Sequence, residues 1–222
     1  MRTLTLLGLS LLACSPLLAE DAAELDPLIS ACAGCHGGHG EGSAELGAPA
    51  LAGQLSQYLA RQLSGFRDGR RGGHPADLGG GTMSGASVGM SDEQIQALSS
   101  YYAQLPALTS TGREAPSDPE SPKPGRRAQD GEIYRDVCGH CHGQDGEGYP
   151  AMGAPRLDIL DAAYLRRQMD SYASGQRGSE QDDDLQSVWM HDVAAHDGDR
   201  EILQRAIDYI AVDGYRDTGS GP

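Results

Sequence analysis

The stretch SACAGCHGGHGEG, residues 30–42, returns later in the chain as RDVCGHCHGQDGEG, residues 135–148. Each copy has two cysteines three positions apart, a histidine directly after the second cysteine, and then a glycine-rich run. Cys-x-x-Cys-His is the attachment motif of c-type haem. Its two thiols lie on one side of a helical turn and form thioethers to the porphyrin, and the histidine supplies a nitrogen to the iron. We therefore predict two covalently bound haem c groups. The predicted binding residues are Cys32, Cys35 and His36 in the first copy and Cys138, Cys141 and His142 in the second.

Two other interpretations of the cysteines remain open from the sequence. Four cysteines in two pairs are enough ligands for zinc, but the pairs are far apart and each has its own adjacent histidine. A disulfide within Cys-x-x-Cys would close a very short loop, which constrains the unfolded chain little. Because the motif occurs twice in matching surroundings, haem attachment is the favoured interpretation.

The similarity between the two copies extends well beyond the motif. The segment YLARQLSGFRDGRRG, residues 58–72, aligns with YLRRQMDSYASGQRG, residues 164–178, and Met83 later aligns with Met190. Matches at a nearly constant offset indicate a duplicated domain. We place one domain at residues 20–105 and the other at 128–222. Residues 106–127 are rich in proline, serine and charge, and we interpret them as a linker.

Both domains are predicted to be all-α. Apolar residues recur at helical spacing in residues 56–69 and 91–105, and shorter helices are expected at 24–32 and 131–138, before each motif. Ser91 and Gln94 form a capping-box pattern at the start of the 91–105 helix. The chain has one Phe, one Trp and 31 Gly, which is a small supply of large apolar side chains. A bound porphyrin would supply the missing apolar surface to each small domain.

The N-terminus and the charge indicate where the protein works. Residues 1–19 have a basic start, a leucine-rich middle and a small-residue end, which is typical of a secretory signal. The alternative is a lipoprotein cleavage site at Cys14, which would attach the protein to a membrane. A net charge of −15 argues against nucleic acid as a partner, because binding to phosphates needs Lys and Arg.

The second axial ligand of each iron is predicted from the repeat. Met83 and Met190 are the methionines at equivalent positions, and each precedes the last helix of its domain, where we expect a loop to cross the haem. His191 is the strongest alternative in the second copy. The other methionines are expected to pack in the interior, and His39 and His74 to face solvent. Those methionines are Met90, Met152 and Met169.

These motifs resemble the dihaem cytochrome c4 family, which has two class I cytochrome c domains in tandem. The resemblance extends over nearly all of residues 24–214 and is strongest in CAGCHG, CGHCHG, APALAGQ, YLARQL and YLRRQM. It implies that the carbonyl of Pro49 contacts His36 and that the carbonyl of Pro155 contacts His142. The second domain departs from the pattern where LAGQ becomes LDIL and where residues 179–189 are unusually acidic.

Iron with both axial positions filled leaves no room for a substrate, so we expect an electron carrier and not an enzyme. A methionine ligand favours ferrous iron and raises the potential. The expected role is periplasmic one-electron transfer from a quinol-oxidising complex or a dehydrogenase to a terminal oxidase or reductase. One alternative is a dedicated electron-accepting subunit of a specific periplasmic oxidoreductase. A dihaem peroxidase is another, and it would need His191 or His196 near an open iron position.

Overall fold

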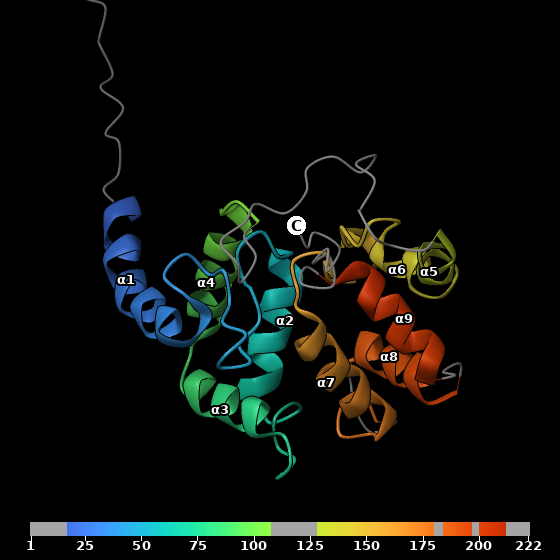
Figure 1. Ribbon diagram of the computed structural model, residues 1–222. Helices are drawn as coiled ribbons and strands as arrows, with labels where there is room; N and C mark the ends of the chain where they lie inside the picture. Colours follow the sequence, from blue (N-terminus) through green and yellow to red (C-terminus); the bar gives the residue numbers. More distant parts are fainter. Residues whose placement is uncertain (1–16, 108–127, 180–183, 197–199, 212–222) are drawn as a thin grey trace, which may run out of the picture.

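The computed structural model describes residues 17–107, 128–179, 184–196 and 200–211, and it forms two groups of helices (Figure 1). The first group is α1 (Leu17–His36), α2 (Ser56–Arg67), α3 (Leu78–Ser87) and α4 (Asp92–Gln104). The second group is α5 (Ala128–Tyr134), the π-helical segment η1 (Arg135–Gly139), α6 (His140–His142), the 3₁₀ turn η2 (Pro150–Met152), α7 (Ala162–Ala173), α8 (Leu185–His196) and α9 (Arg200–Ile210). Within the described ranges the extended structure consists of two isolated bridges, Ser43 with Ala48 and Tyr149 with Ala154. The predicted all-α class is confirmed.

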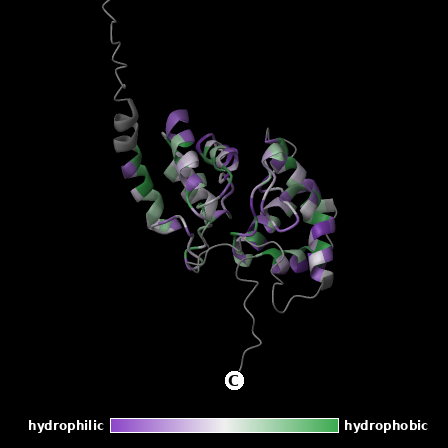
Figure 2. Ribbon diagram, turned by 90° about the horizontal axis from the view of Figure 1, so that it is seen from above, coloured by the Kyte–Doolittle hydropathy of each residue, from purple (hydrophilic) through white to green (hydrophobic). Residues whose placement is uncertain are grey.

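Each group packs around its own small core. In the first, α2 contacts α3 and α4, and Leu59, Leu98 and Tyr102 form the buried centre. In the second, α5 packs on α9 and α7 packs on α8, around a cluster that includes Tyr134 and Ile210. Seen from above, the two groups lie side by side (Figure 2).

The start of α4 agrees with the sequence pattern. The hydroxyl of Ser91 accepts a hydrogen bond from the Gln94 backbone N–H, and the Gln94 side chain accepts one from the Ser91 N–H. This reciprocal cap satisfies two N–H groups that a helix start otherwise leaves without partners.

Two features differ from the sequence-based expectation. The helix predicted at 131–138 is α-helical only as far as Tyr134 and then widens into the π-helix η1. Met83 and Met190 lie on helices α3 and α8, so the expectation that each would lie in a loop was wrong. Asp77 starts α3 by accepting a hydrogen bond from the Gly80 N–H at 2.7 Å, which offsets the poor helix propensity of this glycine-rich segment.

Several expectations concern residues outside the described ranges. These residues include most of the predicted signal segment with Cys14 and nearly all of the predicted linker. They also include most of the acidic run near residue 180, and the side chain of His196 is likewise not described. In the part of the chain that the structure describes, no helix combines the length and apolar character needed to cross a bilayer.

Candidate haem sites

The histidine of each motif is buried and held by a proline carbonyl. His36 and His142 are 5% and 6% exposed. The Nδ1 atom of His36 lies 2.8 Å from the Pro49 oxygen, and that of His142 lies 2.9 Å from the Pro155 oxygen. A carbonyl can only accept, so Nδ1 is the protonated nitrogen and Nε2 keeps a free lone pair for a metal. Burial lowers the pKa of both histidines, although the bond to the carbonyl opposes it. Both imidazoles are therefore neutral, as metal ligation requires.

A glycine turn brings each proline back to its histidine. The N–H of Gly42 donates to the His36 carbonyl at 2.7 Å, and that of Gly148 donates to the His142 carbonyl at 2.8 Å. Their φ angles are +83° and +81°, in the left-handed region that glycine adopts without strain. A Cβ at Gly42 would lie 2.7 Å from the Ala50 nitrogen. The glycines therefore let the loop fold back closely on its own backbone.

The cysteines of each motif differ in exposure. Cys32 and Cys138 are half-buried, whereas Cys35 and Cys141 are exposed, and none of the four is in a disulfide. Burial raises the pKa of the Cys138 thiol to about 12 and also raises that of Cys32. These two are neutral thiols near pH 7, which argues against their being reactive thiolates. Among the described residues, no cluster of three or more His, Cys, Asp or Glu side chains could hold a metal ion.

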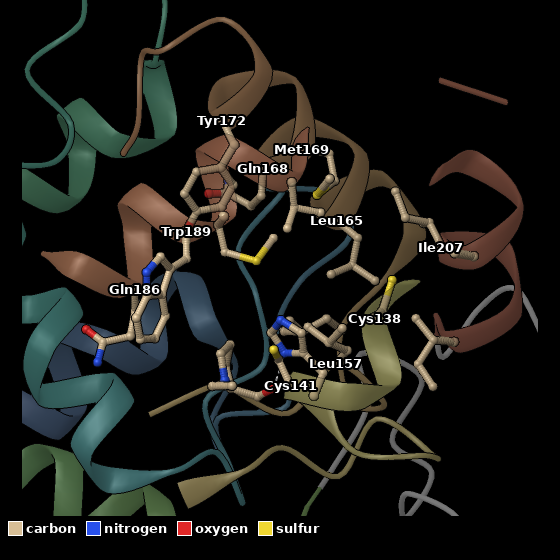
Figure 3. A pocket seen from close by; sticks show the side chains of 18 of the residues that line it. Cys138, Cys141, Leu157, Leu165, Gln168, Met169, Tyr172, Gln186, Trp189 and Ile207 are labelled. Carbon is tan, nitrogen blue, oxygen red and sulfur yellow. Dashed lines mark hydrogen bonds between the residues drawn. The ribbon is translucent and has the colours of Figure 1, made fainter. Parts of the chain in front are cut away.

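The second domain contains a cavity in front of its motif (Figure 3). Its volume of about 160 Å³ is far more than the roughly 10–15 Å³ that one water needs. Cys138, Cys141 and His142 line one side, and Met190 on α8 also lines it. Most of the remaining wall is apolar or aromatic, and includes Leu157, Leu165, Trp189 and Ile207. An apolar cavity with two thiols, a neutral imidazole and a thioether fits a covalently attached porphyrin.

Two further methionines line this cavity, which the repeat did not indicate. Both were expected to pack in the interior: Met169 does pack against the core cluster of the second domain, and Met152 and Met169 also line the cavity with Met190. Each lacks a methionine counterpart in the first copy. The sequence therefore does not show whether such a methionine lines a cavity or packs against other side chains. The strongest alternative ligand, His191, has its Nδ1 2.6 Å from the Tyr172 carbonyl oxygen, and it is not among the residues that line the cavity, whereas Met190 is.

The remaining candidates differ in their surroundings. Met83 is half-buried on α3, and the next residue, Ser84, donates its hydroxyl to the Arg71 carbonyl at 3.1 Å. Met90 packs against the first core cluster. His39 and His74, which were expected to face solvent, are exposed, and so is His140.

Comparisons with known proteins identify the family. The cytochrome c family model matches residues 28–106. A thiosulfate dehydrogenase electron acceptor of Thiomonas intermedia is 32% identical over 168 residues, which cover 69% of this chain and 68% of that protein. Cytochrome c4 of Azotobacter vinelandii is 29% identical over 187 residues, covering 83% of this chain and 85% of that protein. The chain belongs to the dihaem cytochrome c4 family.

Solved structures agree with this assignment. Reduced recombinant cytochrome c4 from Pseudomonas stutzeri superposes with a TM-score of 0.61 at 26% identity, covering 85% of this chain and 96% of that one. A thiosulfate dehydrogenase of Marichromatium purpuratum gives a TM-score of 0.59 at 31% identity over 82% of this chain, which spans only 36% of that protein. The prediction of tandem cytochrome c domains is confirmed.

Membership of the c4 family also establishes the cofactors. The chain carries two covalently bound haem c groups, and its two Cys-x-x-Cys-His motifs are the places that fit them. It is an electron-transfer protein and not an enzyme. When bound, haem supplies a one-electron couple at its iron, and this chain's residues set the position, the ligands and the dielectric around it.

Proposed function

We propose that this c4-type cytochrome is a periplasmic one-electron carrier with two irons ligated by His36 and Met83 and by His142 and Met190. The observation that supports it best is the repeated contact between histidine and proline carbonyl, at 2.8 and 2.9 Å, directly after each cysteine pair. Each contact fixes the orientation of a neutral imidazole and increases its basicity as a ligand. The proposed donors are a quinol-oxidising complex or a dehydrogenase, and the proposed acceptors are a terminal oxidase or reductase.

The choice of methionine rests on position in the fold. Met190 lines the cavity that the second motif also lines, and Met83 is its counterpart on the equivalent helix of the first domain. Met152 precedes Pro155 by three residues, so it belongs to the loop whose Pro155 carbonyl contacts His142. A thioether ligand and an apolar wall both favour the ferrous state, which suits a carrier with a moderately positive potential.

Ligand variants test this assignment. In M83A and M190A we expect haem content to stay at two per chain, while one haem in each variant loses the ferric methionine signature and its potential falls. M169L is the matched control, because it removes a cavity methionine at similar volume. If M169L loses the signature and M190A keeps it, the proposed ligand of the second iron is wrong.

A second candidate function is the dedicated acceptor for a thiosulfate dehydrogenase. It is favoured by the Thiomonas relative and by a second electron acceptor, from Stutzerimonas stutzeri, which is 42% identical over 79 residues. Joining two thiosulfate ions through a new sulfur–sulfur bond releases two electrons, and two haems can accept them one at a time. Stopped-flow reduction by a thiosulfate dehydrogenase with thiosulfate, compared with reduction by a quinol-oxidising complex, separates the two. The dedicated role predicts fast reduction by the thiosulfate dehydrogenase and slow reduction by the quinol-oxidising complex.

Export and membrane attachment have their own test. We propose cleavage after Ala19, with lipidation of Cys14 as the alternative. Mass spectrometry of the mature N-terminus distinguishes a chain that begins at Glu20 from one that begins at an acylated Cys14. An uncleaved Met1 terminus would contradict the proposal of export.

A further inference from the structure

The wall of the second haem cavity reaches the surface at Trp189. Of the described residues that line the cavity, only Cys141 and Trp189 are exposed, and the others are half-buried or buried. Cys141 is one of the two cysteines of the motif, so an attached haem lies against it. Trp189 is 46% exposed, and Figure 3 shows its indole on the side of the cavity opposite Ile207. The indole therefore extends from the haem cavity to the solvent.

Trp189 belongs to an exposed stripe along α8. Leu185, four residues before it, is 53% exposed, and Asp192, three residues after it, is exposed as well. Side chains three or four positions apart lie next to each other on one face of a helix. On the inner side of α8, Met190 lines the cavity and Ala194 is buried. One face of α8 therefore closes the haem cavity, and the other presents Leu185, Trp189 and Asp192 to solvent. We call these three residues the α8 patch.

The apolar part of the patch would be more stable against another surface than in water. Trp189 is the only tryptophan of the chain, and its indole has a leucine beside it. Exposure of such large apolar side chains costs free energy that burial in a contact would recover. Tryptophan is also one of the residue types that most often dominate contacts between proteins. A partner that covers the patch would gain affinity and would at the same time approach the second haem.

The first domain has only part of this patch. Leu78 on α3 is the counterpart of Leu185 and is 79% exposed. The position of Trp189, however, is occupied by Thr82, and that of Asp192 by a glycine. The Thr82 hydroxyl donates to the Leu78 carbonyl at 3.0 Å, so it is bonded back to its own helix. The complete patch is therefore a feature of the second domain and not of the repeat.

The charges around the patch indicate what kind of protein can dock there. Asp192 is part of the patch, and the chain as a whole has a net charge of −15. The sequence directly before Leu185 is acidic at four of five positions, namely Glu180, Asp182, Asp183 and Asp184. Of the arginines that line the cavity, Arg177 is buried and Arg61 is paired with Asp184 at 3.3 Å. An apolar contact with acidic neighbours complements an apolar contact with basic neighbours.

We propose that the α8 patch is the surface through which the second haem exchanges electrons with a redox protein whose own contact is apolar and surrounded by lysine or arginine. One electron crosses between the partner and the second iron, so the oxidation of one centre is matched by the one-electron reduction of the other. Trp189 is the point of contact and is not itself oxidised. The proposal rests on the proposed role as an electron carrier, and it adds the domain and the helix face that the partner uses.

Two electron donors, one that must dock and one that need not, test this surface on the ferric holoprotein. The first is zinc-substituted mitochondrial cytochrome c, a lysine-rich protein whose photoexcited zinc porphyrin gives one electron to a ferric haem. The second is hexaammineruthenium(II), a small cation that needs no apolar surface. The readout for each variant is the ratio of the two second-order rate constants. Because an altered haem changes both rates, the ratio reports the docking of the protein donor.

W189T gives the second domain the residue of the first, and we expect the ratio to fall about tenfold, as for the loss of a central aromatic contact. L185S should lower the ratio in the same direction. L78S is the matched control, because it removes the equivalent exposed leucine of the first domain, and it should match the wild type. D192N should weaken the dependence of the protein rate on ionic strength. E93Q, which neutralises an exposed carboxylate of the first domain, should leave that dependence unchanged.

Other outcomes overturn the proposal. Equal ratios in W189T, L185S and the wild type would exclude the α8 patch, and a fall in L78S alone would place the docking on the first domain. A donor protein with acetylated lysines that reacts as fast as the unmodified donor would exclude a basic partner. If W189T does not retain two haems, L185S decides the outcome, because Leu185 does not line the cavity. A wild-type protein that hexaammineruthenium(II) cannot reduce would contradict the proposed function itself, so the two failures are distinguishable.

Discussion

Replacing Gly42 by alanine should strongly destabilise the first domain, because this glycine lies in the tightest part of the turn that carries Pro49. Gly42 has a φ of +83°, and an added Cβ would lie 2.7 Å from the Ala50 nitrogen and 3.0 Å from the Pro49 carbonyl carbon. Both neighbours are backbone atoms, so no side chain can rotate away. The same backbone carries the oxygen that holds His36.

The expected size of the effect follows from two terms. A non-glycine residue in the left-handed region costs about 1–2 kcal/mol. Forcing an extra methyl into a packed site costs about 1–3 kcal/mol. We expect G42A to lower the free energy of unfolding by roughly 3 kcal/mol, which corresponds to a fall of about 12–24 °C in the Tm of a domain of this size.

The control is G38A in the same loop, because a Cβ at Gly38 would meet nothing within 4 Å and its φ is not left-handed. Thermal unfolding is followed by circular dichroism and by haem absorbance, on protein with two haems per chain. G38A should change the unfolding free energy by less than about 0.5 kcal/mol. A G42A protein as stable as G38A would refute the account of why this loop requires glycine.

Two smaller predictions concern a helix cap and the helix that bears Met190. S91A removes the hydroxyl that caps α4 through the Gln94 N–H and should lower the unfolding free energy by about 1 kcal/mol, and an unchanged denaturation midpoint would contradict it. H191A removes the hydrogen bond to the Tyr172 carbonyl and should lower the unfolding free energy by about 1 kcal/mol, while the ligation of the iron is unchanged. The control is H140A, because His140 is exposed. A high-spin haem in H191A alone would make His191 the ligand.

Most of the haem site could be predicted because the chain contains it twice. The cysteine spacing predicts the attachment, and the repeat nominates Met83 and Met190 from among the methionines, a prediction that the ligand variants test. The capping box at Ser91 was also readable, because its partners are three residues apart and depend only on local geometry.

The remaining features depend on contacts between distant segments. Arg71 and Arg177 donate to both Gln62 and Gln168 and so join α2, α7 and the turns that follow these helices. Periodicity within one helix says nothing about which face meets another domain. The π-helical turn that contains Cys138 has no residue pattern that distinguishes it from an α-helix. Met169 packs against the core cluster, as expected, and it also lines the cavity, which helical spacing could not indicate because both positions give the same apolar signal.

The most direct test of the whole account is the number of methionine-ligated irons per chain. The ferric holoprotein is scanned from the visible to the near-infrared, and the methionine–iron band is quantified against total haem iron. The account predicts two haems and two methionine-ligated irons per chain. One such iron, or none, would contradict the twin sites at His36 with Met83 and at His142 with Met190.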